Sequence, residues 1–153
     1  MSDEEFLKLA IKQSELSVEQ GRFPAGALIV FKNQIITSET SDTHNGYQHA
    51  ECKAIDKAFQ KIGKLTNTTL YASMEPCLMC LMRAYWSGIR RIVYAIGRND
   101  LNQQYYEGLQ DNRKIVENLN ESVEYLQIPE LENEALKIVR IWEEKQKNGF
   151  NPD

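Results

Sequence analysis

The stretch Thr68-Thr69-Leu70-Tyr71-Ala72-Ser73-Met74-Glu75-Pro76-Cys77-Leu78-Met79-Cys80 joins a strand pattern to a helix pattern through a short turn. Residues 68–72 are β-branched, apolar or aromatic, which predicts a strand. Pro76 suits the first turn of a helix, because its missing N–H would be unpaired there anyway. We expect that helix to reach Ser87 and to end at Gly88. A strand followed at once by a helix favours an α/β fold.

Strand and helix patterns alternate on both sides of this unit. Apolar residues at spacings of three and four predict a first helix over residues 3–20. Further strand patterns lie at 27–31, 35–38, 91–95 and 122–128, and further helix patterns at 49–62, 111–119 and 130–147. We therefore predict an α/β protein, a three-layer α/β/α sandwich around a mostly parallel five-stranded mixed sheet. The length of 153 residues suits one domain, residues 1–153.

Composition and charge narrow the function classes. The chain is 26% charged and 42% hydrophobic, which is typical of globular proteins. No apolar run is long enough to cross a bilayer, and the acidic start Met1-Ser2-Asp3-Glu4-Glu5 does not resemble a secretory signal. We therefore expect a cytoplasmic protein with no membrane partner. The net charge of −4 counts against a nucleic-acid partner, because such binding depends on clustered Lys and Arg.

The clearest chemical pattern is His49-Ala50-Glu51, followed after twenty-four residues by Pro76-Cys77-Leu78-Met79-Cys80. His49, Cys77 and Cys80 can give Zn²⁺ three ligands and leave the fourth tetrahedral position for water, as a catalytic site requires. Glu51 need not bind the metal and can transfer protons. H-x-E…P-C-x-x-C is the signature of zinc-dependent nucleobase deaminases.

The chain resembles the cytidine-deaminase-like superfamily, in the branch that holds guanine deaminases, fungal-type cytosine deaminases and tRNA adenosine deaminases. Besides the two metal motifs, Pro24-Ala25-Gly26-Ala27 is similar to the P-x-G-A segment of that branch, and residues 71–77 are similar to its strand-to-helix run. The resemblance implies a Zn²⁺ cofactor, a small-molecule nucleobase as substrate and a homodimer. It also implies that Glu51 is the catalytic proton shuttle.

The resemblance extends to a second acidic residue. Guanine deaminases have an aspartate after the strand that corresponds to residues 91–95 here, and this aspartate helps to bind and protonate the purine. The resemblance therefore gives that catalytic role to Asp100 in Arg98-Asn99-Asp100. A helix N-cap or loop residue is the alternative interpretation. Ser41 or Asp42 stands where this branch commonly has an asparagine that holds the polar edge of the ring. For Asp42 a turn-forming role is an equal alternative.

Other residues are candidates to contact the ring. Phe23, Tyr47 and Trp86 can wall a flat base, although each can also pack in the core. Gly26 has no side chain and can let a base approach the backbone. The remaining substrate-binding candidates belong to the same motifs and are Ala25, Ala27, Ala50 and Glu75.

We expect a hydrolytic deaminase of the guanine-deaminase type, which releases ammonia from a free nucleobase or related amino-heterocycle. The alternatives are a cytosine or other aminopyrimidine deaminase, a tRNA adenosine-to-inosine deaminase and a non-catalytic zinc-binding module. A closed zinc site would need a fourth ligand, for which Cys52 is the candidate, but we expect Cys52 to be a small buried residue. His44 lies outside the motif and is expected to be a loop residue.

Overall fold

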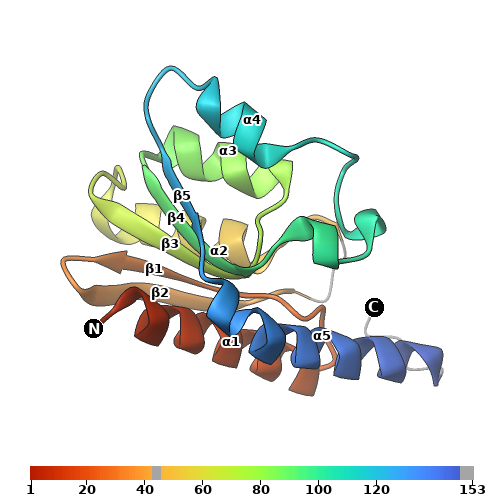
Figure 1. Ribbon diagram of the computed structural model, residues 1–153. Coiled ribbons are helices and arrows are strands. Elements are labelled where there is room, and N and C mark those ends of the chain that lie inside the picture. The colour runs from red at the N-terminus through yellow and green to blue at the C-terminus, as the bar shows by residue number, and fades with distance from the viewer. Residues whose placement is uncertain (43–45, 149–153) are drawn as a thin grey trace.

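A computed structural model of the chain describes residues 1–42 and 46–148 (Figure 1). The prediction for His44 lies outside these residues. Five strands form one sheet in the order β2-β1-β3-β4-β5. The strands are β1 (Gly26–Phe31), β2 (Gln34–Thr40), β3 (Thr68–Met74), β4 (Arg91–Ile96) and β5 (Glu124–Gln127).

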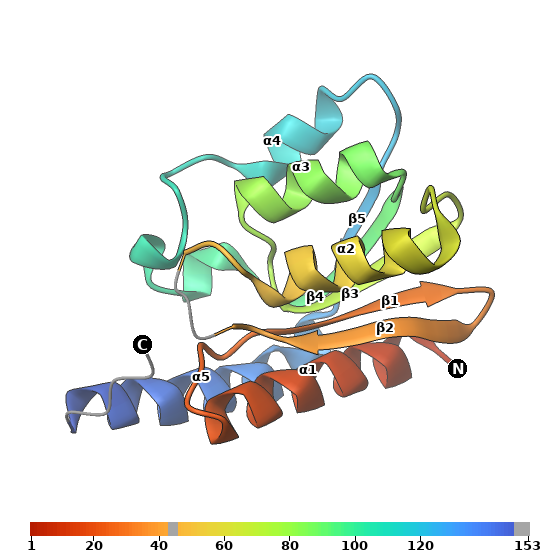
Figure 2. The same cartoon turned by 180° about the vertical axis from the view of Figure 1, so that it is seen from behind.

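Helices cover both faces of the sheet, which confirms the predicted three-layer α/β/α sandwich. Figures 1 and 2 show α1 and α5 side by side on one face, with α2 and α3 on the other and α4 beyond α3. The α-helices are α1 (Asp3–Glu19), α2 (Ala50–Ile62), α3 (Leu78–Ser87), α4 (Asn112–Glu117) and α5 (Glu132–Lys147). Three short 3₁₀ helices are η1 (Arg98–Asp100), η2 (Gln103–Tyr105) and η3 (Pro129–Leu131).

The sheet is mixed, as predicted, but its parallel part is confined to β3, β4 and β5. Strand β1 runs antiparallel to both β2 and β3, whereas β3–β4 and β4–β5 are parallel. Two of the four pairings are therefore parallel. The carboxyl ends of β3 and β4 meet at one edge, where ligand sites of α/β sheets commonly form. The turn that leads to Cys77 begins at this edge.

Two helices start later than predicted, α3 by two residues and α2 by one. Helix α3 begins at Leu78 with Cys77 as its N-cap residue, so Pro76 precedes the helix and does not belong to its first turn. Helix α2 begins at Ala50 with His49 as its N-cap residue. Both N-cap residues have extended backbone angles. The first residues of each metal motif therefore lie at a helix start, where backbone N–H groups lack helical partners.

Gly26 allows α1 to pack closely against β1. A Cβ atom on Gly26 would lie 2.3 Å from the carbonyl oxygen of Ala10 and 2.4 Å from the backbone nitrogen of Ser14. Any side chain at this position would push the helix from the sheet. Gly26, predicted to let a flat base approach the backbone, therefore faces α1 and does not line the pocket described below.

An ion pair connects the start of α1 to the sheet. Both carboxylate oxygens of Asp3 accept hydrogen bonds from the guanidinium of Arg91, at 2.8 and 2.6 Å, and Tyr71 Oη donates to the same carboxylate at 2.5 Å. The hydrogen bond from Arg91 lowers the pKa of Asp3 to about 2, against the effect of partial burial. Among the described helices, none has the length and apolar content needed to cross a membrane.

Candidate metal centre and substrate pocket

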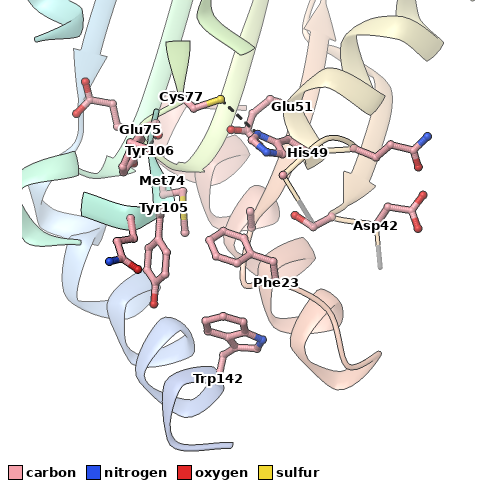
Figure 3. A pocket seen from close by; sticks show the side chains of 15 residues that line it. Phe23, Asp42, His49, Glu51, Met74, Glu75, Cys77, Tyr105, Tyr106 and Trp142 are labelled. Atoms are coloured by element: carbon pink, nitrogen blue, oxygen red, sulfur yellow. Dashed lines mark hydrogen bonds between the residues drawn. The ribbon is translucent and has the colours of Figure 1, made fainter. Parts of the chain in front are cut away.

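Three side chains from two helix starts converge at the edge of the sheet. His49 Nδ1 lies 3.3 Å from Cys77 Sγ and 3.4 Å from Cys80 Sγ. One ligand atom from each of the three residues lies within 4.8 Å of the others. Figure 3 shows the Cys77 and His49 side chains pointing toward one another at the head of the pocket. The structure therefore brings together the three predicted metal ligands.

Hydrogen bonding shifts the pKa values of Cys77 and His49 toward their charged forms. Hydrogen bonding with Cys80 and with His49 lowers the pKa of Cys77 to about 5. The hydrogen bond with Cys77 raises the pKa of His49 to about 9, although burial opposes this. Both shifts favour the charged form of the group, a thiolate at Cys77 and an imidazolium at His49. Zinc requires thiolate and neutral imidazole as ligands, so binding of the ion would displace the proton from His49.

Cys52 lies behind this group. Its Sγ atom is 3.3 Å from Cys80 Sγ, and its side chain is buried in the core. Within the described residues, the set of mutually close ligand atoms contains His49, Cys77 and Cys80 but not Cys52. Three protein ligands with room for water are typical of a catalytic zinc site.

Glu51 is buried beside the metal ligands with one oxygen unpaired. The residue is 4% exposed, and its Oε1 atom has no hydrogen-bond partner within the described residues. Burial raises the pKa of Glu51 to about 7, although the nearby His49 charge opposes this. An unpaired buried oxygen is costly unless a bound group satisfies it. Both the ligand chemistry and this oxygen therefore fit a Zn²⁺ ion with an attached water or substrate.

A pocket of about 390 Å³ opens in front of Glu51 and His49. One side is aromatic, with the Phe23 ring centroid 5.1 Å from that of Tyr105 and 5.2 Å from that of Trp142, both edge-on (Figure 3). The other apolar lining residues are Ala25, Met74 and Tyr106. Polar residues that line the pocket are Ser41, Asp42, Gln48, Glu75 and Gln104. Such a pocket, mostly apolar with a few polar groups, suits a small flat molecule.

Several predicted contact residues line this pocket. They are Phe23, Ala25, Ser41, Asp42 and Glu75. Figure 3 shows the Asp42 carboxylate directed away from His49 and the pocket centre. Glu75 is engaged elsewhere, because its carboxylate accepts hydrogen bonds from Tyr125 Oη at 2.7 Å and from the Arg98 backbone N–H at 2.9 Å.

Other predicted contact residues lie away from the pocket. Trp86 is 81% exposed on the outer side of α3, and Tyr47 is 72% exposed. Ala27 and Ala50 are fully buried in the core, so neither presents a surface to a ligand. Asp100 is exposed in η1 and lines a separate polar hollow. Asp100 is the last residue of η1, and it does not line the pocket that contains Glu51.

Residues that sequence reasoning missed form most of the aromatic wall. Tyr105 and Tyr106 lie in the irregular stretch after β4, and Trp142 lies on α5. The only local signal is a pair of adjacent tyrosines in an otherwise polar stretch. Trp142 follows the apolar periodicity of its helix and therefore resembled a core residue.

Comparison with known proteins agrees with this geometry. The family model for the cytidine and deoxycytidylate deaminase zinc-binding region matches residues 1–96. A probable cytosine deaminase of Schizosaccharomyces pombe is 36% identical over 99 residues, which span 63% of this chain and 61% of that relative. A tRNA-specific adenosine deaminase of Buchnera aphidicola is 30% identical over 142 residues, 90% of this chain and 91% of that one.

A solved structure of guanine deaminase from Bacillus subtilis superposes with a TM-score of 0.64 and 28% identity, over 94% of this chain and 95% of the other. The chain is thus similar to relatives that are named for three different substrates. The chain belongs to the zinc-binding cytidine and deoxycytidylate deaminase family, whose members are hydrolases acting on C–N bonds.

Proposed function

We propose that the protein deaminates a free nucleobase or related amino-heterocycle, with guanine-type bases as the first candidates, and releases ammonia. The observation that carries this proposal is the unpaired, buried Glu51 carboxylate between three zinc ligands and an aromatic pocket of about 390 Å³. Aromatic side chains hold a flat heterocycle by stacking and edge contacts. The likeness to a guanine deaminase over nearly the whole of both chains supports this substrate class.

Metal binding, proton transfer and ring binding are assigned to different residues of the site. A Zn²⁺ ion held by His49, Cys77 and Cys80 would supply a water molecule whose pKa is lowered toward neutrality. Glu51 accepts a proton from the attacking water and passes it to the ring nitrogen beside the reacting carbon. Glu51 then carries a second proton to the departing amine, so that water replaces NH₂ and ammonia leaves. Phe23 and Tyr105 hold the ring in place and keep other water molecules out.

Asp100 has no part in this mechanism. Its exposed position in η1 and its separation from the pocket lining argue against direct contact with a base at Glu51. The catalytic role that resemblance implied for Asp100 is therefore not carried into the proposal.

We also propose a homodimer formed by the outer face of α2 and α3. The Asp56–Arg83 ion pair lies there among apolar side chains, of which Phe59 and Trp86 are 46% and 81% exposed. Exposed apolar patches of this kind mark interfaces. We expect light scattering to give twice the chain mass, and W86D to give the mass of one chain. The reduced thiols needed for zinc binding are consistent with a cytoplasmic location.

An ammonia-release assay tests the function. The panel contains the bases guanine, cytosine and adenine, the corresponding nucleosides including adenosine, triazine amines and a tRNA anticodon stem-loop. We expect guanine or another free amino-heterocycle to be consumed by the wild-type protein and not by E51Q, with equal zinc content in both. Inosine formation in the stem-loop without turnover of any free base would refute the proposal and favour the tRNA reaction. Zinc-loaded protein without turnover of any compound would favour a binding module.

A further inference from the structure

One wall of the pocket is a segment without regular strand pairing. We call residues 103–110 the wall segment; it contributes Gln104, Tyr105 and Tyr106 to the pocket lining. Its regular structure is limited to the three residues of η2. A segment with so few backbone hydrogen bonds of its own needs side chains to hold it in place.

The guanidinium of Arg98 supplies these hydrogen bonds from the far side of the wall. It donates to the carbonyl oxygens of Gly108 and Gln110, and to Gln103 Oε1 at 3.3 Å. Its Cζ atom lies 4.4 Å from the centroid of the Tyr106 ring. Arg98 lines the neighbouring polar hollow but not the substrate pocket.

The charge on Arg98 is unusual for its environment. The residue is 7% exposed, and within residues 1–42 and 46–148 no carboxylate forms an ion pair with it. Burying a cation is unfavourable unless its donors are satisfied, and here neutral oxygens of the wall segment satisfy them. Arginine presents donors from two terminal nitrogens in a fixed plane, and Arg98 uses both, whereas lysine offers its three donors from a single nitrogen.

The wall segment is also attached to Glu75 and to the start of α3, the part of the chain that carries Cys77 and Cys80. Tyr106 Oη donates to the carbonyl oxygen of Glu75 at 2.7 Å. The Glu107 carboxylate accepts from the backbone N–H groups of Leu78 and Met79, each at 3.0 Å. The wall segment is therefore held between Arg98 on one side and Glu75 with the start of α3 on the other.

We propose that Arg98 is a positioning residue whose guanidinium holds the wall segment closed against the pocket and so sets the width of the base site. Among the described residues, no hydrogen bond joins it to the zinc ligands or to Glu51, and it does not line their pocket. Loss of the guanidinium should therefore weaken the binding of a flat substrate more than it slows the chemical step. The part of the test that uses substrate rests on the proposed function, whereas the structural part does not.

The test compares R98K with wild-type protein and with R140K, a control at an exposed arginine of α5. We expect hydrogen exchange at the amides of residues 103–110 to be about tenfold faster in R98K and unchanged in R140K. Zinc content should stay the same in all three. In a W86F background Trp142 is the one remaining tryptophan, and its fluorescence should become more accessible to a neutral quencher in R98K.

Kinetics and rescue complete the test. For any substrate that the wild-type protein turns over, R98K should raise KM about tenfold and change kcat much less. Free guanidinium ion, well below denaturing concentrations, should restore exchange protection in R98A. If R98K does not fold, Y106F replaces it in the test. This variant removes only the hydrogen bond to Glu75, and it should show a smaller increase in hydrogen exchange of residues 103–110 and in KM. Wild-type exchange and fluorescence in folded R98K would overturn the proposal, even if no substrate had been found.

Discussion

Glu107 accepts a hydrogen bond of 3.0 Å from the backbone N–H of Leu78, the first residue of the helix that carries Cys80. The pKa of Glu107 is lowered, because hydrogen bonds from Met79 and Leu78 outweigh the effect of partial burial. A lowered carboxylate pKa stabilises the folded protein above the unfolded pKa, and the effect is lost as the pH falls through the folded value.

We therefore expect E107A to lower the free energy of unfolding by about 1 kcal/mol or less near neutral pH, because the side chain is largely exposed. The difference from wild type should shrink in acid. Urea unfolding at about pH 7 and about pH 3 measures this, with E117A as an exposed control. A difference that stays constant with pH would show that the carboxylate charge is not the cause.

The proton-transfer role of Glu51 gives a kinetic expectation. E51Q keeps the size of the side chain but cannot accept a proton, so turnover should fall by about a hundredfold to ten-thousandfold while zinc content is unchanged. In the wild-type protein the acid limb of kcat/KM should lie between the ordinary pKa of 4.5 and about 7, because burial raises the pKa and a bound cation lowers it again. Near-normal turnover by E51Q would exclude the role.

The same carboxylate should make the zinc-free protein less stable in base. Glu51 has a pKa of 4.5 as a free group and about 7 in the fold, so the folded state binds more protons between these values. Stability then falls as the pH rises through this window and stays lower above it. We expect E51Q, prepared with a chelator, to be more stable than wild type by roughly 1–3 kcal/mol above about pH 7, and by less near about pH 4. Thermal unfolding across this range would detect an effect of opposite sign.

Replacement of Cys52 separates an open zinc site from a closed one. C52A should retain one zinc ion per chain, because Cys52 contacts a ligand sulfur without belonging to the ligand set. The loss of a buried sulfur should reduce stability by about 1 kcal/mol. C77A should lose the metal. Elemental analysis of the purified variants distinguishes these outcomes, and loss of zinc from C52A would identify Cys52 as a fourth ligand.

The Asp3–Arg91 pair should contribute stability that disappears in acid. The pKa of Asp3 falls from 3.8 to about 2 on folding, so the contribution is present above about pH 4 and is lost as the pH falls toward 2. Both side chains are about a third exposed, which limits the effect of D3N to about 1 kcal/mol. Thermal unfolding of D3N and the control E4Q, at neutral and acid pH, measures it. Equal losses in D3N and E4Q would point to general surface charge instead.

The metal centre could be predicted from the sequence because each of its parts is local. His49 and Cys77 each precede a helix, and the chemistry of zinc limits which residues can serve as ligands. The aromatic wall could not be predicted in this way. The position of Tyr106 depends on a buried arginine that donates to backbone carbonyls, and such contacts leave no periodic pattern in the sequence. Periodicity also cannot tell which face of a helix meets a cavity, so the sequence predicts Trp86 as a contact residue, whereas Trp142 lines the pocket.

Local chemistry was equally ambiguous at Gly26 and Asp100. A glycine can serve either a ligand or a neighbouring helix, and here a backbone carbonyl of α1 occupies the space beside it. An aspartate after a strand can face the crevice or solvent, and the 3₁₀ turn that decides between them is formed only in the folded chain. The starts of α2 and α3 differ from their predicted positions by one and two residues for the same reason, because capping depends on three-dimensional contacts.

The aromatic lining has an uneven origin along the chain. Of its four aromatic side chains in the described residues, Phe23 precedes residue 96, whereas Tyr105, Tyr106 and Trp142 follow it. The metal ligands and Glu51 thus lie in one stretch of the chain, and most of the aromatic lining lies in another. Substitutions after residue 96 can therefore change which substrate is accepted without altering the metal ligands or Glu51. An exchange of this part of the chain between relatives should transfer substrate preference and leave the deamination reaction intact.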